Sequence, residues 1–301
     1  MADRSGPTTL RDVVTRVVGL LAEADRLEPE VRQDAAREGR LLVAAVLGLS
    51  PGELAQRLVL HPVITPAEMA SVERALHRRL RGEPLAYAVG TAAFRDLVLQ
   101  VDARVLIPRP ETEVVVGEAL RVTADRVGGI AVDIGTGSGA IALSLAMEGH
   151  FARVIATDIS ADALAVASAN AERLWRGGAP VEFRMGADLA PIAGERARVL
   201  VANPPYIAYA EATALPASVR DWEPPLALFA PDDGLARYRA LIAGASAVLE
   251  PGGWLVCEVD TRRAALTAEL AESAGLQQVQ VVQDLSGRDR VLVAQTPSAG
   301  N

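Results

Sequence analysis

The sequence contains no lysine, because all 30 of its basic residues are arginine. A Walker A phosphate loop and Schiff-base chemistry both require a lysine side chain, so this chain uses neither. The sequence also lacks the G-x-S-x-G turn that carries the nucleophile of many serine hydrolases. These absences exclude P-loop nucleotide hydrolysis, lysine-based covalent catalysis and nucleophile-elbow hydrolysis.

Cysteine and histidine are also scarce. The one cysteine, Cys257, excludes an intramolecular disulfide, and there is no C-x-x-C pair for a metal. It lies in the apolar stretch WLVCEV, which is typical of a buried strand. His61, His77 and His150 are scattered and have no metal-ligand spacing. The sequence therefore predicts no metal site.

Long apolar runs and a basic tail are also missing. No apolar run is long enough to suggest a membrane span, and the segment MADRSGPTTL lacks the apolar core of a signal peptide. We therefore expect a cytoplasmic protein without membrane contact. The net charge of −8 disfavours direct nucleic-acid binding through phosphates, although a local positive face remains compatible with it.

The remaining patterns indicate three regions. Residues 1–85 carry apolar positions at helical spacing, interrupted by prolines, and are expected to form a helical recognition domain. Residues 86–109, with FRDLVLQVDARVLI, are expected to form a linking β-hairpin. Residues 110–301 are expected to form the main domain, which begins with a helix at Pro110. Arg109 and Glu111 fit either a helix start or the edge of a cofactor site.

Strand-like segments alternate with helix-like segments beyond Pro110. This alternation predicts an α/β fold with a mostly parallel sheet covered by helices on both faces. The last two candidates are separated only by a short polar segment and could pair as an antiparallel hairpin. The seven candidates are Ile130–Ile134, Arg153–Thr157, Val181–Met185, Arg198–Ala202, Trp254–Val259, Gln278–Gln283 and Val291–Ala294.

A glycine-rich turn follows the first of these strands. In AVDIGTGSGAIALSLA, glycines at 135, 137 and 139 precede a helix expected to begin near Ala140. Glycine lets the backbone turn tightly and approach a ligand without a Cβ atom in the way. Such a turn alone is weak evidence for a ligand, because many helices follow a glycine loop for packing reasons.

Two acidic residues add weight to this site. Asp158 ends the next strand and can accept hydrogen bonds from both hydroxyls of a ribose. Asp188 follows the third strand, where its side chain could accept from an adenine amino group. The spacing is G-x-G-x-G rather than the G-x-G-x-x-G of dinucleotide enzymes, which favours S-adenosylmethionine over NAD.

The segment VLVANPPYIA places two prolines directly after the fourth strand. Proline cannot continue the ladder, and it holds the preceding Asn203 in an extended conformation. The Asn203 side-chain oxygen and the Pro204 carbonyl can both accept hydrogen bonds from a substrate NH2 group. Tyr206 could pack on a planar group and exclude water. This pattern favours methylation of a conjugated nitrogen by orientation, without a basic side chain.

Taken together, these motifs resemble the release factor glutamine methyltransferase family from about Arg78 onward. The matching segments are RRLRGEPLAY, VLIPRPETE, DIGTGSGAIALSLA, ANPPYI, DWEPPLALFAPDDGL, PGGWLVCEV and SGRDRVLVA. The resemblance implies a Rossmann-like class I methyltransferase sheet of seven strands with an antiparallel last strand. It also implies a small helical N-terminal domain that helps dock the substrate, joined by a β-hairpin.

The resemblance further implies an activity and a set of site residues. The activity is methyl transfer from S-adenosylmethionine to the glutamine amide in the Gly-Gly-Gln loop of class 1 peptide-chain release factors, which leaves S-adenosylhomocysteine. The residues implied to hold the glutamine amide and to carry catalysis are Asn203, Pro204, Pro205 and Tyr206. Those implied to bind the methyl donor are Gly135, Thr136, Gly137, Ser138, Gly139, Asp158, Asp188, Leu189 and Asn203.

Ala93 and Asp96 depart from the family pattern, which usually has an acidic residue and a glycine there. These departures concern the recognition surface rather than methyl transfer. Two alternatives therefore stay open. In the first, the protein performs the same methyl transfer, but to a ribosomal-protein glutamine or a nucleic-acid amino group. The other is a non-catalytic module that binds the donor and a partner.

Overall fold

The protein is described here by a computed structural model, which covers residues 8–60, 62–176, 180–231 and 233–298. His61 and the outer ends of the expected domains, residues 1–7 and 299–301, lie outside the described residues. The chain forms two compact units. One comprises Met1–Thr91 and Leu215–Trp222, and the other comprises Ala92–Ala214 and Glu223–Asn301.

The first unit is helical, as expected. Three of its helices begin with a reciprocal capping box, in which a Thr or Ser side chain and an acidic side chain satisfy backbone N–H groups at the helix start. Prolines 29, 51 and 66 each start a helix. The helices are α1 (Leu10–Ala22), α2 (Pro29–Gln33), α3 (Ala35–Val46), α4 (Pro51–Val59), α5 (Pro66–Leu80), α6 (Leu85–Val89) and α10 (Ala217–Arg220).

A buried arginine connects the helices of this unit. Arg79 of α5 is 3% exposed, and its guanidinium donates to Glu38 of α3 over 2.7 Å and to the carbonyl of Glu83 over 2.9 Å. The segment 215–222 joins the unit through Ser218, whose N–H donates to Glu28 over 3.1 Å. Within the described ranges, no single helix is long and apolar enough to span a membrane, and only the bent pair α3 and α4 meets that test when taken together.

The expected hairpin is formed by β1 (Thr91–Phe94) and β2 (Leu97–Gln100). The chain is helical up to Val89, so the hairpin begins later than position 86. Gly90, with φ +80°, ends the helix in a left-handed conformation that suits glycine.

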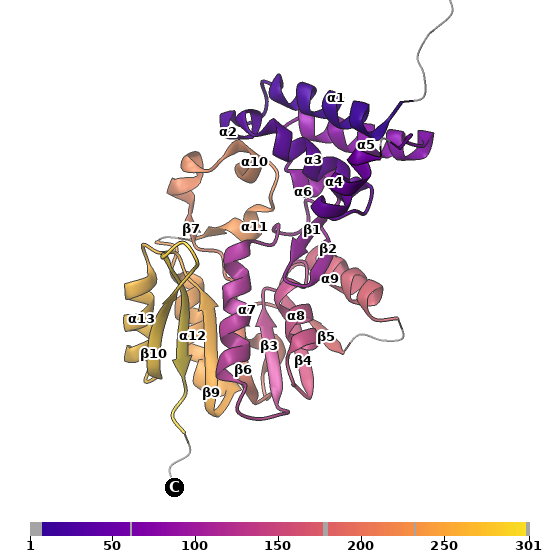
Figure 1. Cartoon of the computed structure of the whole chain (residues 1–301). Helices are drawn as coiled ribbons and strands as arrows, with labels where there is room; N and C mark the ends of the chain where they lie inside the picture. The colour runs from indigo at the N-terminus through magenta and orange to yellow at the C-terminus, as the bar shows by residue number, and fades with distance from the viewer. Residues whose placement is uncertain (1–7, 61, 177–179, 232, 299–301) are drawn as a thin grey trace, which may run out of the picture. The chain divides into compact units, whose positions relative to one another are not determined.

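The second unit contains a seven-stranded sheet with strand order β10-β11-β9-β6-β3-β4-β5 (Figure 1). β11 is antiparallel to both of its neighbours, whereas β9, β6, β3, β4 and β5 are mutually parallel. This arrangement, a mostly parallel sheet of seven strands with an antiparallel last strand, is the one that the family resemblance implies. The strands are β3 (Ile130–Ile134), β4 (Arg153–Asp158), β5 (Val181–Met185), β6 (Ala197–Ala202), β9 (Leu249–Glu258), β10 (Gln277–Gln283) and β11 (Asp289–Gln295).

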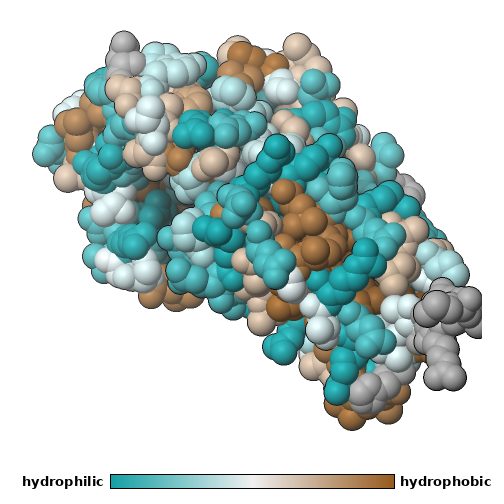
Figure 2. All heavy atoms as spheres, turned by 90° about the horizontal axis from the view of Figure 1, so that it is seen from above, coloured by the Kyte–Doolittle hydropathy of each residue, from teal (hydrophilic) through white to brown (hydrophobic). Residues whose placement is uncertain are grey.

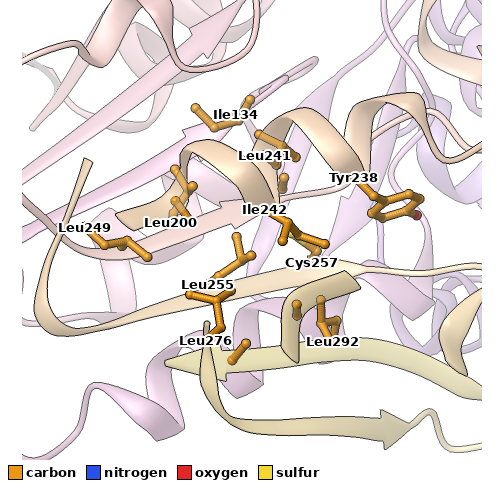
Figure 3. Packing of buried hydrophobic residues seen from close by; sticks show 14 of the residues in the cluster. Ile134, Leu200, Tyr238, Leu241, Ile242, Leu249, Leu255, Cys257, Leu276 and Leu292 are labelled. Atoms are coloured by element: carbon orange, nitrogen blue, oxygen red, sulfur yellow. The ribbon is translucent and has the colours of Figure 1, made fainter. Parts of the chain in front are cut away.

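Helices cover both faces of the sheet, and each face has its own hydrophobic cluster. One cluster includes residues of α7 (Pro110–Val122), α8 (Ala140–Glu148) and α9 (Ala161–Leu174). The other includes residues of α12 (Ala236–Val248) and α13 (Ala264–Ser273). Figure 3 shows this second cluster, where Leu241 and Ile242 of α12 lie over Leu200, Leu255 and Cys257 of the strands. The two-sided burial explains why the central strands are continuous apolar runs.

Shorter elements complete the second unit: β7 (Ile207–Ala208), β8 (Phe229–Ala230), α11 (Pro225–Leu228), and the 3-10 helices η1 (Ala190–Ile192) and η2 (Tyr209–Ala214). β7 pairs with β8 in parallel. The surface seen in Figure 2 is mostly hydrophilic, with hydrophobic residues in separate groups.

Candidate active site

A cavity of about 350 Å³ lies at the carboxyl ends of β3, β4, β5 and β6. Ligands of open α/β sheets bind at this edge, because the loops that follow parallel strands meet there. The loop before α7, the start of α7 and the segment after Glu223 complete the wall. The lining segments are Ala103–Leu106, Pro108–Arg109, Thr112, Ile134–Ser138, Ala140–Ile141, Thr157–Ser160, Asp162–Ala163, Gly186–Asp188, Asn203–Pro205, Pro224, Leu226–Ala227, Arg237 and Leu241.

The glycine loop between β3 and α8 borders this cavity. Gly135 and Gly137 have φ of +74° and +55°, and a Cβ atom on either one would meet nothing within 4 Å. Both glycines therefore present bare backbone to the cavity. Gly139, with φ +86°, differs because a Cβ there would lie 3.0 Å from Leu143 of α8. Its role in the fold is close packing at the start of the helix.

Asp158, at the end of β4, is 9% exposed and holds the glycine loop in place. One carboxylate oxygen accepts from the N–H of Gly137 and the other from the N–H of Ser160, each over 2.9 Å. Each oxygen keeps a further lone pair, because a carboxylate can accept about four hydrogen bonds. Asp158 therefore combines a structural role in the loop with free acceptor capacity at the cavity.

Asp133 of β3 lies buried beneath the same loop. Its Oδ2 accepts from the Thr136 hydroxyl over 2.6 Å and from the N–H of Ala142 over 3.1 Å. Its Oδ1 is buried and has no hydrogen-bond partner. Burial raises the pKa of Asp133 to about 7, against the lowering effect of these two hydrogen bonds. The Asp133 carboxyl group therefore holds the glycine loop and the start of α8 through Oδ2 alone.

Asp188 borders the cavity as a member of an ion pair. Its carboxylate accepts from Nη1 of Arg237 on α12, over 3.0 Å and 3.1 Å to the two oxygens. It has a φ of +49°, which is uncommon for a residue with a side chain. The neighbouring Leu189 packs its side chain toward α12, so close that a Cβ on Gly244 would lie 2.4 Å away.

The NPPY segment follows β6, and Asn203, Pro204 and Pro205 line the cavity. The amide Nδ2 of Asn203 donates to the hydroxyl of Thr112 over 3.1 Å. That hydroxyl donates in turn to Oε2 of Glu258 over 2.5 Å. Glu258, at the end of β9, is 2% exposed, and burial raises its pKa to about 7 although the Thr112 hydrogen bond lowers it.

Tyr206, unlike the three residues before it, is part of a hydrophobic cluster. Its side chain packs against the cluster that contains Tyr238, and it is not among the described residues that line the cavity. Burial raises the pKa of Tyr206 to about 12. The phenol therefore stays neutral at physiological pH.

Glu223 connects two segments of the cavity wall. It is 3% exposed, pairs with the Arg109 guanidinium, and accepts from the N–H of Ile107 over 3.1 Å. The segment that includes Arg109 and the segment that begins at Pro224 are thereby held together. Arg109 also occupies the N-cap position of α7, where its side chain makes no capping hydrogen bond, and it lines the cavity.

Comparisons with known proteins identify the family of this chain. Residues 20–90 match the model of the PrmC N-terminal domain, and residues 116–217 match that of the Methyltransferase small domain. A release factor glutamine methyltransferase of Cereibacter sphaeroides is 40% identical over 282 residues, which cover 93% of this chain and 98% of the relative. One of Moorella thermoacetica is 41% identical over 291 residues, covering 95% and 98%. The chain belongs to the release factor glutamine methyltransferase family.

The fold of this family member also resembles a solved methyltransferase from Pyrococcus furiosus. That structure has a TM-score of 0.50 and 18% sequence identity, and the match covers 66% of this chain and 88% of the other. At this identity the likeness concerns the fold alone. The protein is thus a methyltransferase by family, with the sheet architecture of that enzyme class.

The structure brings together most of the residues expected at the site of this methyltransferase. The residues that line one cavity are Gly135, Thr136, Gly137, Ser138, Asp158, Asp188, Asn203, Pro204 and Pro205. Gly139, Leu189 and Tyr206 are not among the described residues that line it. The donor-binding, substrate-binding and catalytic roles of all these residues remain predictions.

Sequence reasoning did not single out Thr112 and Arg237, which line the cavity, or Glu223 and Glu258, which hold residues of its wall. A signal for one of them exists, because Glu258 is an acidic residue inside the apolar strand WLVCEV. A carboxylate is almost never fully buried without a partner, so this position indicated a specific role. Among the described residues, no group of three or more His, Cys, Asp or Glu side chains could hold a metal ion.

Proposed function

We propose that this methyltransferase transfers a methyl group from S-adenosylmethionine to the side-chain amide nitrogen of a glutamine. We propose as its substrate the Gly-Gly-Gln motif of class 1 peptide-chain release factors. The observation that carries this proposal is that Asn203 and Pro204 line the same cavity as Asp158 and the glycine loop. The sites that we propose for a nucleoside-bearing donor and for a planar NH2 group thus share one cavity.

The residues at the carboxyl edge of the sheet fit the donor. Gly135 and Gly137 leave open space where side chains would stand, so the backbone can approach the donor closely. Asp158 has lone pairs available for the two ribose hydroxyls. When bound, S-adenosylmethionine supplies a methyl carbon on a positively charged sulfur, and S-adenosylhomocysteine is left after transfer. The ion pair of Asp188 with Arg237 borders the same space and supplies polar groups to its wall.

The residues after β6 fit the acceptor. We propose that Oδ1 of Asn203 and the carbonyl of Pro204 accept the two N–H groups of the substrate amide. An amide nitrogen is a weak nucleophile, because its lone pair is delocalised into the carbonyl. Two fixed acceptors orient that lone pair, and their hydrogen bonds strengthen as positive charge develops on the nitrogen. The nitrogen then releases a proton to solvent, and no side-chain base is required.

We further propose that residues 1–85 recognise the release factor, that residues 86–109 act as the linker, and that residues 110–301 bind the donor. The enzyme is proposed to be cytoplasmic, without a membrane partner and without direct binding to nucleic acid. The net charge of −8 supports the last point, because phosphate binding requires basic surfaces.

The direct test is an incubation of the protein with methyl-labelled S-adenosylmethionine and one of three acceptors. The acceptors are a purified class 1 release factor, a ribosomal protein and tRNA. We expect label on the Gly-Gly-Gln peptide of the release factor, located by mass spectrometry after proteolysis. A release factor in which this glutamine is replaced by glutamate is the matched control and should remain unlabelled. Label on only the ribosomal protein or tRNA would contradict the proposed substrate.

A further inference from the structure

Three side chains from distant parts of the sequence form a directed hydrogen-bond chain that begins at the cavity wall and ends at a buried carboxyl group. Asn203 follows β6, Thr112 lies in the first turn of α7, and Glu258 ends β9. Thr112 and Glu258 are 5% and 2% exposed, so solvent has little access to either. We call this chain Asn203–Thr112–Glu258 the amide relay.

The hydroxyl of Thr112 has one hydrogen, and this determines the direction of the relay. An ionised Glu258 can only accept, so the Thr112 hydrogen points to Oε2 over 2.5 Å. The oxygen of Thr112 is then the acceptor for Nδ2 of Asn203 over 3.1 Å. Because the side-chain amide is planar, holding Nδ2 toward Thr112 leaves Oδ1 as the polar atom on its other side.

We propose that Thr112 and Glu258 are positioning residues that set the orientation of the Asn203 amide, so that Oδ1 rather than Nδ2 meets the substrate nitrogen. This inference rests on the proposed function, in which the substrate presents an NH2 group to Asn203. If the amide were turned over, its NH2 group would face the substrate NH2 group. Two donors would then oppose each other, and the acceptor that favours methyl transfer would be lost.

Protonation of Glu258 removes the preference for one orientation of the Asn203 amide. A protonated carboxyl can donate to Thr112, and the Thr112 hydrogen is then free to donate to Oδ1 of a turned Asn203 amide. The charged groups that influence the pKa of Glu258 come from several elements. Arg290 of β11 and Arg109 before α7 favour the carboxylate, whereas Glu111 of α7 opposes it. Tyr206 and Tyr238 are neutral neighbours with raised pKa values.

The kinetic test compares three threonine variants. Thr112→Val keeps the shape of the side chain but has no hydroxyl, and we expect kcat to fall about 10- to 100-fold. Thr112→Ser restores a hydroxyl and should recover most of that loss. Thr123→Val is the matched control, because Thr123 is also buried, caps the end of α7 and donates to Ala119 over 2.6 Å away from the cavity. Equal kcat values for Thr112→Val and Thr123→Val would overturn the proposal.

The second test uses pH. In the wild type, kcat should fall as pH is lowered through about 7, where Glu258 takes up a proton. The glutamine of Glu258→Gln has no charge, and its amide can donate or accept a hydrogen bond. This variant should therefore have a lower kcat than the wild type at pH 8, and its kcat should not show the change near pH 7 that Glu258 causes. A wild-type step near pH 7 that persists unchanged in Glu258→Gln would assign that step to another group and contradict the relay.

A third measurement does not depend on methyl transfer. The side-chain NH2 resonances of Asn203 can be followed by 15N NMR in the donor-free protein, with Asn203→Asp used for assignment. We expect these resonances to shift between pH 8 and pH 6 in the wild type but not in Glu258→Gln. If the wild type methylates none of the three acceptors, the proposed function fails, and this titration still tests the relay. Resonances that are independent of pH in both proteins would refute the relay itself.

Discussion

The side-chain amide of Asn170 donates to the backbone carbonyl of Ser138 over 2.9 Å and connects α9 to the glycine loop. The same side chain is fully buried and makes two further hydrogen bonds, both to the backbone of Gln100 at the end of β2. One residue therefore holds the hairpin and the loop of the cavity in a common position.

Asn170→Ala should destabilise the protein by about 2 to 4 kcal/mol. The substitution leaves the buried carbonyl of Ser138 without a partner, at a cost of about 1 to 3 kcal/mol, and the two backbone groups of the exposed Gln100 add less because water can replace their partner. Urea unfolding measures the change in free energy. Glu172→Ala, at an exposed position of the same helix, is the control and should stay within about 0.5 kcal/mol of the wild type. Equal stability of the two variants would show that the Asn170 contacts contribute little.

Gly135→Ala and Gly287→Ala form a matched pair. Both glycines have positive φ, +74° and +77°, and a Cβ on either one would meet nothing within 4 Å. Each substitution should therefore cost about 1 to 2 kcal/mol in backbone strain. Only Gly135 lines the cavity, so only Gly135→Ala should also weaken S-adenosylmethionine binding, by at least about 10-fold in calorimetry. Equal donor affinity in the two variants would contradict the placement of the donor on this loop.

The stability of the protein should depend on pH through Asp133. Its folded pKa is raised to about 7 by burial, above an unfolded value of about 4. The folded state therefore binds the proton more tightly between these values, and the free energy of unfolding contributed by Asp133 decreases as pH rises from about 4 to about 7. Asp133→Asn lacks this dependence, so its stability relative to the wild type should increase from pH 5 to pH 8.

A suitable control for this pH experiment is Asp284→Asn. The Ser286 hydroxyl and other hydrogen bonds lower the pKa of Asp284 to well below its usual value, so it stays ionised at both pH values. Its effect on the free energy of unfolding should be the same at pH 5 and pH 8. If the free energy of unfolding of Asp133→Asn relative to the wild type is also the same at pH 5 and pH 8, then Asp133 is ionised throughout this range.

The roles of Asp158 and Asn203 should be separable. Asp158→Ala should weaken donor binding about 100-fold, because hydrogen bonds to a charged group contribute about 1.5 to 3 kcal/mol each. Asn203→Ala should leave donor affinity within a few-fold of the wild type but abolish measurable turnover. Calorimetry with S-adenosylhomocysteine and the label-transfer assay distinguish the two effects. A comparable loss of donor affinity in both variants would argue against the division of roles.

Much of the fold could be predicted because local patterns determine it. β3 and β5 have the bounds that their apolar runs predict, and β4, β6 and β10 differ by one residue at one end. β9 begins at Leu249, five residues earlier than expected, because Pro251, Gly252 and Gly253 conceal the start of the strand in the sequence. Proline and glycine usually interrupt strands, and here the register with β6 shifts in the same region.

The site was only partly predictable for a different reason. Gly135 and Asp158 belong to a short motif with a fixed relation to two adjacent strands, so their meeting at the cavity follows from topology. Thr112 and Glu258 are 146 positions apart in the sequence, and their contact depends on how α7 packs against β9. The same holds for Ile107 and Glu223, which are 116 positions apart. Nothing in the local sequence around such residues identifies the partner.

The position of Cys257 has a practical consequence. This thiol belongs to β9, which runs between β6 and β11, and packs in the cluster beneath α12; it is 1% exposed, and burial raises its pKa to about 12. A thiol reagent needs both access and the thiolate form, and the folded state offers neither. Labelling can therefore proceed only after the centre of the sheet has opened. The protein thus contains its own single-site reporter of cooperative unfolding, and the labelling rate at increasing denaturant measures that opening without an added probe.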